Sequence, residues 1–152
     1  MTDDKYRIID LGVFAVANLT NVLMAGVFLA RFRGAQRIEF NLGVIAVAMI
    51  VPLVVAVIFN VAGKREWWTV VLPLVLVLYL LVELLLDYVF KIPFRDTALI
   101  WPYILLFYAG LMAMIGYTFL VGRVFGAITL VTYFVQLTVM LYTHMQKGIH
   151  QP

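Results

Sequence analysis

The feature that most constrains this chain is a series of five apolar segments, each about 20 residues long. A helix needs about 20 apolar residues to cross the hydrocarbon core of a bilayer. The chain is 65% hydrophobic and only 12% charged, a balance far from that of soluble domains. The expected spans are residues 8–30, 42–62, 67–90, 98–121 and 124–145. We therefore expect an all-α bundle of five transmembrane helices with short loops, forming one integral membrane domain over residues 1–152.

Several residues mark the ends and bends of these spans. Pro52 lies near the middle of the second span and predicts a kink there. Gly122-Arg123 is the clear separation between the last two spans, which predicts a tight hairpin. Amphipathic rings stand at span ends, where they are expected to anchor in the headgroup region: Trp67, Trp68, Trp101 and Tyr103.

The basic residues flank the spans and account for the net charge of +3. An odd number of spans places the two termini on opposite sides of the membrane. The N-terminal face is expected to hold Lys5, Arg7, Lys64, Arg65 and Arg123. The other face is expected to hold Arg31, Arg33, Arg37, Lys91, Arg95 and Lys147. This small excess favours a cytoplasmic C-terminus, in what we expect to be a prokaryotic cytoplasmic membrane.

Composition also excludes several classes of protein. The chain has no cysteine, so it has no disulfides, thiol catalysis or cysteine-based zinc sites. No basic run is long enough to bind nucleic acid. His144 and His150 have no carboxylate at ligand spacing, so we predict neither a metal site nor a cofactor.

Six polar side chains are predicted to share one level near the bilayer centre. With a rise of about 1.5 Å per residue, all six lie between about 14 and 22 Å from the N-terminal face. They come from four of the spans: Asn18, Asn21, Glu83, Tyr108, Tyr133 and Gln136. The amides and phenols alone could simply join helices, since each needs only one partner in an apolar core. We interpret the six together as a candidate ligand- or proton-binding layer.

Glu83 differs from the neutral members because a carboxylate in hydrocarbon is costly and points to function by default. No Lys or Arg is expected at its level, so the acid should be wholly or partly protonated. A neutral carboxyl group hydrogen-bonded to Asn21 or Gln136 is the structural alternative. Asp87 is one turn nearer the interface and is expected to pair with Lys91, four residues further on, which makes these two secondary.

The fifth span carries a seam of small and polar residues with a 3.5-residue period. Gly122 and Gly126 would allow close backbone approach, either to the fourth span or to a second copy of the chain. Ala109 and Ala113 on the fourth span are the expected facing surface. Asp10 begins the first span, where a carboxylate is expected to cap the helix.

Three functions stay open at this point. The favoured one is a proton- or cation-linked transporter or channel-like protein that uses Glu83, working as a homodimer because five spans make a thin pathway. The second is an intramembrane lipid- or isoprenoid-binding protein or enzyme, although the chain has no HExxH motif, no Ser–His pair and no predicted catalytic residue. The third is a structural or accessory subunit of a larger membrane complex. The expected partners are the bilayer, a second copy, and a proton, cation or lipid ligand.

Overall fold

The chain folds into helices throughout the part that the computed structural model describes, the backbone of residues 2–149 and the side chains of 4–146. The predicted basic residue Lys147 and the histidine His150 lie outside these described side chains. The helices are α1 (Thr2–Phe32), α2 (Gln36–Ala48), α3 (Ile50–Ala62), α4 (Trp68–Glu83), the π-helix η1 (Leu84–Val89), the short 3₁₀ helix η2 (Phe94–Asp96), α5 (Ile100–Val121) and α6 (Arg123–Ile149). Five of the resulting helical segments are long and apolar enough to cross a membrane, and no strand occurs within residues 2–149. The all-α, five-span prediction is confirmed.

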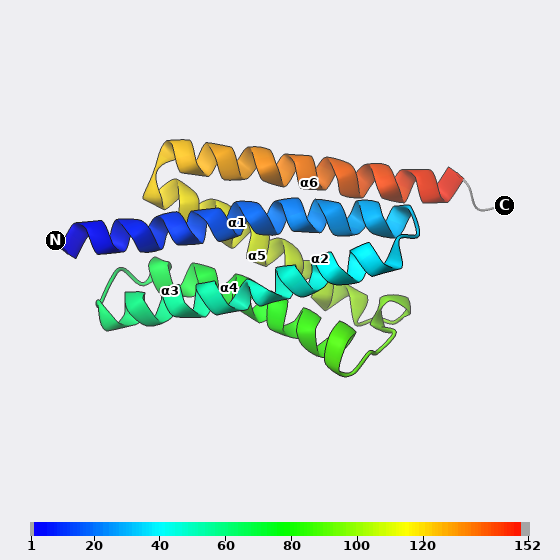
Figure 1. Cartoon of the computed structure of the whole chain (residues 1–152), viewed down its shortest axis with the longest axis horizontal. Helices are drawn as coiled ribbons and strands as arrows, with labels where there is room; N and C mark the ends of the chain where they lie inside the picture. Colours follow the sequence, from blue (N-terminus) through cyan, green and yellow to red (C-terminus); the bar gives the residue numbers. More distant parts are fainter. Residues whose placement is uncertain (1, 150–152) are drawn as a thin grey trace.

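The second span is interrupted at Met49, between α2 and α3. Pro52 has no backbone N–H, so it cannot donate to the carbonyl of Ala48 four residues earlier. Just before Pro52, the amide of Met49 donates to the carbonyl of Ala46 at 3.1 Å. This hydrogen bond spans three residues and makes a tighter turn than that of an α-helix. The two pieces still follow one another along the bundle, and together they make the single span Gln36–Ala62 (Figure 1).

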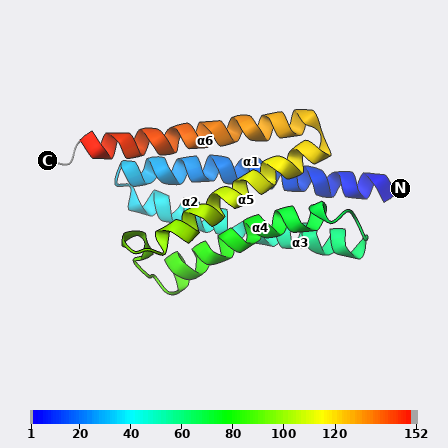
Figure 2. The ribbon, with the colours of Figure 1, turned by 180° about the vertical axis from the view of Figure 1, so that it is seen from behind.

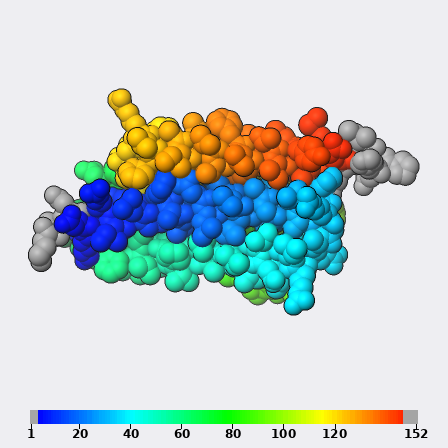
Figure 3. Space-filling view, turned by 45° about the horizontal axis from the view of Figure 1, so that its top comes forward, coloured from blue at the N-terminus to red at the C-terminus, as the bar shows by residue number. Residues whose placement is uncertain are grey.

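Successive spans run in opposite directions, so the loops gather at two ends (Figure 1). The N-terminal face carries the start of α1, the α3–α4 loop and the α5–α6 turn. The C-terminal face carries the α1–α2 turn, the α4–α5 loop and the end of α6. Helix α1 lies between α6 on one side and α2–α3 on the other, as the space-filling view shows (Figure 3). Helices α4 and α5 pack together on the opposite side of the bundle (Figure 2).

Glycines make the two tightest connections between spans. Gly34, in the α1–α2 turn, has a φ of 69°, a left-handed conformation that glycine adopts without steric cost. The α5–α6 turn falls at Gly122, where the sequence predicted the break, and its backbone is extended. These short turns place α1 beside α2 and α5 beside α6.

The interior is apolar and so is much of the exterior. Fully buried side chains fill the middle of the bundle, among them Val13, Leu53, Leu76, Leu80 and Met114. Large apolar side chains are also exposed around the circumference, such as Leu105 and Val131. A surface of this kind is stable only against lipid, so the protein is a membrane-embedded bundle.

The glycine seam of α6 packs differently from the expectation. A Cβ at Gly126 would lie 2.2 Å from the ring of Phe119, so this glycine accommodates an aromatic side chain of α5. Ala113 is buried, but Ala109 is exposed and does not form the facing surface. The close approach of α5 occurs at Gly110, where a Cβ would lie 3.3 Å from the Cα of Leu76 in α4.

Candidate functional site

Glu83 is the last residue of α4, at the point where the α-helix gives way to the π-helix η1. The wider turn is evident at its end, where the amide of Phe90 donates to the carbonyl of Leu85 at 2.8 Å, five residues back. Wide turns of this kind are rare in proteins, and those that occur often lie at functional sites. The residue is only 6% exposed, so its carboxyl group lies within the bundle.

Two phenols hold the Glu83 carboxyl group. Its Oε2 atom accepts a hydrogen bond from the Tyr79 hydroxyl and another from the Tyr103 hydroxyl, the latter at 2.5 Å. The two hydroxyl oxygens lie 3.1 Å apart. Neither Asn21 nor Gln136 is hydrogen-bonded to Glu83 among the described side chains, contrary to the structural alternative above.

Tyr103 was expected to anchor in the headgroup region, and this interpretation is wrong. Its ring packs against those of Tyr79 and Phe94, with centroid separations of 5.6 and 4.7 Å, and its hydroxyl points inward to Glu83. Trp67 and Trp101 are 68% and 73% exposed, as residues at a headgroup interface would be.

Asp87 pairs with Arg95 and not with Lys91. The guanidinium donates two hydrogen bonds to the carboxylate, at 2.9 and 2.5 Å. The predicted spacing of four residues assumed an α-helix, but the chain here is a π-helix that ends at Val89. Lys91 follows in a left-handed conformation with a φ of 51° and is exposed. The chain then turns back through η2, which brings Arg95 to Asp87.

A second ion pair lies nearby at the C-terminal face. Arg31, in the last turn of α1, donates a 2.7 Å hydrogen bond from Nε to Oε1 of Glu39, in the first turn of α2. This pair bridges the α1–α2 turn.

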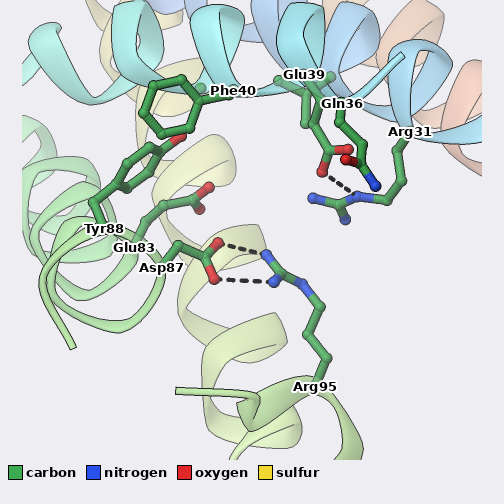
Figure 4. A pocket seen from close by; sticks show the side chains of 10 residues that line it. Arg31, Gln36, Glu39, Phe40, Glu83, Asp87, Tyr88 and Arg95 are labelled. Atoms are coloured by element: carbon green, nitrogen blue, oxygen red, sulfur yellow. Dashed lines mark hydrogen bonds and ion pairs between the residues drawn. The ribbon is translucent and has the colours of Figure 1, made fainter. Parts of the chain in front are cut away.

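These groups surround a polar cavity of about 240 Å³. Figure 4 shows the Glu83 carboxyl directed into the space between the Asp87–Arg95 and Arg31–Glu39 pairs. The lining comes from α1, α2, α4, η1 and η2: Val27, Arg31, Gln36, Glu39, Phe40, Gly43, Glu83, Asp87, Tyr88 and Arg95. Because Oε2 is held by the two phenols, Oε1 is the oxygen left for a ligand or proton.

A larger and mostly apolar cavity of about 530 Å³ adjoins the same carboxyl group. It lies among α1, α4, α5 and α6, with Glu83, Arg31, Arg95 and His144 at its polar margin. Its apolar and aromatic lining is Met24, Val27, Phe28, Tyr79, Ile100, Tyr103, Ile104, Phe107, Tyr108, Met140 and Leu141. Glu83 therefore stands at the junction of a polar and an apolar space.

The charges around the two cavities do not balance. Arg31 and Arg95 line both cavities, and each is already paired with its own carboxylate, Glu39 or Asp87. Burial lowers the pKa of Arg95, but the hydrogen bonds and charge of Asp87 outweigh it and leave that pKa above its ordinary value. Of the lining carboxyl groups, Glu83 is the one without an ion-pair partner among the described residues.

The two asparagines of the predicted layer join α1 to α6 instead of reaching Glu83. Asn18 donates to the Thr129 hydroxyl at 3.1 Å and accepts from the Thr132 hydroxyl at 2.8 Å. Asn21 donates to the Thr132 hydroxyl at 2.9 Å. Depth along the helices does not give direction, and these amides face a different helix from Glu83.

The other three members of the layer are spread along α5 and α6. Tyr108 borders the apolar cavity, and its hydroxyl lies 3.5 Å from the sulfur of Met140. Tyr133 is buried. Gln136 is 1% exposed, and its Oε1 has no hydrogen-bond partner among the described residues. The structure therefore brings one of the six, Tyr108, to a cavity that Glu83 also lines.

A separate polar cluster closes the N-terminal face. Arg65, in the α3–α4 loop, donates to both carboxylate oxygens of Asp10 at 2.8 and 2.9 Å and to Oδ1 of Asn60 at 3.0 Å. The Tyr117 hydroxyl donates to Asp10 at 2.6 Å. The hydrogen bond to Asp10 raises the pKa of Arg65 despite its burial. Asp10 does not cap α1, which begins at Thr2, two turns earlier.

No group of three or more potential metal ligands occurs among the described residues. No protein-family model, curated protein or solved structure matches the chain. The function is therefore argued from the site itself.

Proposed function

We propose that this protein is a proton- or cation-linked membrane transporter in which Glu83 takes up the proton or cation. The single observation that supports it is the unbalanced carboxyl group at the junction of the two cavities. An intramembrane acid costs free energy, and here Tyr79 and Tyr103 hold it in place by hydrogen bonds instead of neutralising it with a cation.

The two phenols allow Glu83 to change protonation state without moving the backbone. When the carboxyl group is ionised, both hydroxyls donate to it, which stabilises the negative charge. When it is protonated, it can itself donate, because a phenol oxygen also accepts. The Tyr79 and Tyr103 hydroxyl oxygens are 3.1 Å apart, so one phenol can donate to the other in that state.

The polar cavity lies toward the C-terminal face. Its lining residues Arg31, Glu39 and Arg95 belong to the last turn of α1, the first turn of α2 and the α4–α5 loop. Toward the other face the bundle is filled by buried apolar side chains, and the Asp10–Arg65 cluster closes the end. Transport then requires a second state in which this N-terminal end opens.

The proposal takes the membrane to be a prokaryotic cytoplasmic membrane with the C-terminal face in the cytoplasm, on the small excess of basic residues there. It also includes a homodimer, because five spans leave little room for a pathway within one copy. A second candidate function, an intramembrane lipid-binding protein, is favoured by the size and apolar lining of the cavity beside Glu83.

The test is flux in proteoliposomes that contain a pH-sensitive dye. A pH step across the liposome membrane drives proton movement while the outside solution contains sodium, potassium or a series of alkylammonium ions in turn. We expect the wild type to move protons in at least one of these solutions at a rate that Glu83→Gln loses. The control is Asp96→Asn, which removes a carboxylate from the same face without touching either cavity. Equal rates in the wild type and Glu83→Gln under all solutions would refute the proposal.

A further inference from the structure

We infer that the substrate is an amphipathic organic cation, with its charge at Glu83 and its apolar body in the cavity of about 530 Å³. This inference rests on the proposed function, since it names the substrate class of the same site. The observations that carry it are the sign of the unbalanced charge, the chemistry of the cavity wall and the position of its opening.

The sign of the charge favours a cation. The charged residues lining the polar cavity are two arginines and three acids, and each arginine is already hydrogen-bonded to an acid of its own. An anionic headgroup would have to break one of these pairs, or approach Glu83 against its charge. A cationic headgroup instead provides Glu83, the third acid, with an ion-pair partner.

The wall of the larger cavity favours an organic body over a bare metal ion. Five Phe and Tyr rings line it, and aromatic faces attract organic cations. They are Phe28, Tyr79, Tyr103, Phe107 and Tyr108. Cavities of about 300–1,000 Å³ with mostly apolar walls and few polar groups are typical of small-molecule sites. A bare sodium ion would require a shell of oxygen ligands, which apolar side chains cannot provide.

The cavity also faces the bilayer. Ile104 of α5 and Leu141 of α6 line it and are 36% and 50% exposed on the lipid-facing surface of the bundle. An amphipathic cation concentrates in the membrane, because its apolar part leaves water while its charge stays near the headgroups. Such a substrate can enter between α5 and α6 at the level of the C-terminal face.

Proton and cation compete for one carboxyl group, so binding of the cation should strengthen as the pH rises. The ionisable groups that share a cavity with Glu83 are Arg31, Glu39, Tyr79, Asp87, Tyr88, Arg95, Tyr103, Tyr108 and His144. His144 is the imidazole among them, and a charged imidazole would also repel a bound cation. The test must therefore separate Glu83 from His144.

The experiment measures binding to the purified full chain in nanodiscs of zwitterionic phosphatidylcholine, with empty nanodiscs as background. The probes are tetraphenylphosphonium and tetraphenylborate, which share their shape and differ in the sign of their charge. We expect saturable binding of tetraphenylphosphonium, and none of tetraphenylborate. Glu83→Gln should weaken the binding at least about 30-fold, as expected for loss of one partner of a desolvated charge pair. The matched control Asp96→Asn should bind like the wild type.

The pH series supplies the second readout. Affinity for tetraphenylphosphonium should rise with pH, by up to about tenfold per unit where one proton is displaced, and His144→Gln should keep this dependence. Tyr103→Phe removes one donor to the ionised carboxylate, so it should move the midpoint to higher pH. That variant keeps the test decisive even if Glu83→Gln does not fold.

Three results with the two probes overturn the inference. They are equal binding of the two probes, unchanged binding in Glu83→Gln, and loss of the pH dependence in His144→Gln. A co-purified phospholipid that the cation fails to displace would also overturn it, in favour of the lipid-binding candidate. Glu83-dependent flux of protons or small cations without selective phosphonium binding would remove the substrate class and leave the proposed function. Selective phosphonium binding without any flux would remove the proposed transport function and leave the class of ligand.

Discussion

The Asp10–Arg65 cluster should contribute strongly to stability in a way that depends on both residues. The two side chains are 13% and 18% exposed, and the guanidinium makes two hydrogen bonds to the carboxylate. Removing one partner of such a pair leaves a buried charge, at a cost of about 3–5 kcal/mol for full burial. Because these side chains keep some exposure, we expect about 3 kcal/mol for Asp10→Asn or for Arg65→Met.

Removing both charges should cost much less than the two single changes together. Replacement of a buried pair by uncharged side chains is often close to neutral, since the cost of desolvating both ions also disappears. We therefore expect Asp10→Asn/Arg65→Met to lie within about 1 kcal/mol of the wild type.

The assay is unfolding by increasing mole fraction of dodecyl sulfate in a mild detergent, followed by tryptophan fluorescence. Trp68 reports on this end of the bundle, because its ring packs edge-on against Tyr117 with a centroid separation of 5.3 Å. The matched control is Arg31–Glu39 at the other face, whose side chains are 32% and 24% exposed. Removing this ion pair should lower the free energy of unfolding by less than about 1 kcal/mol. The reasoning would be refuted if the loss of unfolding free energy in the double variant equalled the sum of the losses in the two single variants.

Three further predictions concern packing between the helices and use the same unfolding assay. Gly126→Ala should destabilise the protein by about 1–3 kcal/mol, because the added methyl group would overlap the ring of Phe119. Its control, Gly12→Ala, has open space around the added methyl group and should be neutral or stabilising. Equal effects of the two substitutions would contradict this prediction. Gln136→Leu should be neutral or stabilising, because the buried amide oxygen has no partner among the described residues, and a loss above about 1 kcal/mol would show that it has one. Thr132→Val should cost about 1 kcal/mol, since it breaks hydrogen bonds to both asparagines of α1, and no loss would show that these bonds add nothing.

The spans could be predicted from the sequence because length and hydropathy alone determine them. Each apolar run long enough to cross the bilayer is helical. The break between α5 and α6 falls at Gly122, in the pair Gly122-Arg123 that separates the last two apolar runs in the sequence. The helices extend beyond the predicted spans, since α1 begins at Thr2 and the first predicted span begins at residue 8. A helix can continue beyond the hydrocarbon, where hydropathy no longer reports on it.

The polar layer shows what sequence alone leaves open. Residue number gives the depth of a side chain along a helix, but not which neighbouring helix it faces. Asn18 and Asn21 were placed near Glu83 by depth, yet they contact α6 while Glu83 contacts α5. The spacing of Tyr79 and Glu83, four residues apart on one helix, was a signal for their contact.

The loop residues of the site could not be found by spacing. Arg95 reaches Asp87 because a π-helix, a left-handed residue and a 3₁₀ turn reverse the chain between them. Tyr103 looked like an interface residue by its position, and only the packing of α4 against α5 turns its hydroxyl toward Glu83. Regular periodicity predicts contacts within helices, and these contacts arise where periodicity ends.

The same local pairs explain why Glu83 is left without a cation, and they yield a decisive prediction. Arg95 is eight residues from Asp87, so the short reversal of the chain gives it a partner before Glu83 can compete. In Asp87→Asn, Arg95 is freed and can pair with Glu83 in the shared cavity, which would then hold equal numbers of positive and negative groups. We expect this variant to lose tetraphenylphosphonium binding about as fully as Glu83→Gln, although Glu83 is intact. Adding Arg95→Gln should restore the binding, because Glu83 again lacks a partner. Wild-type affinity in Asp87→Asn would show that the charge balance around Glu83 does not govern the site.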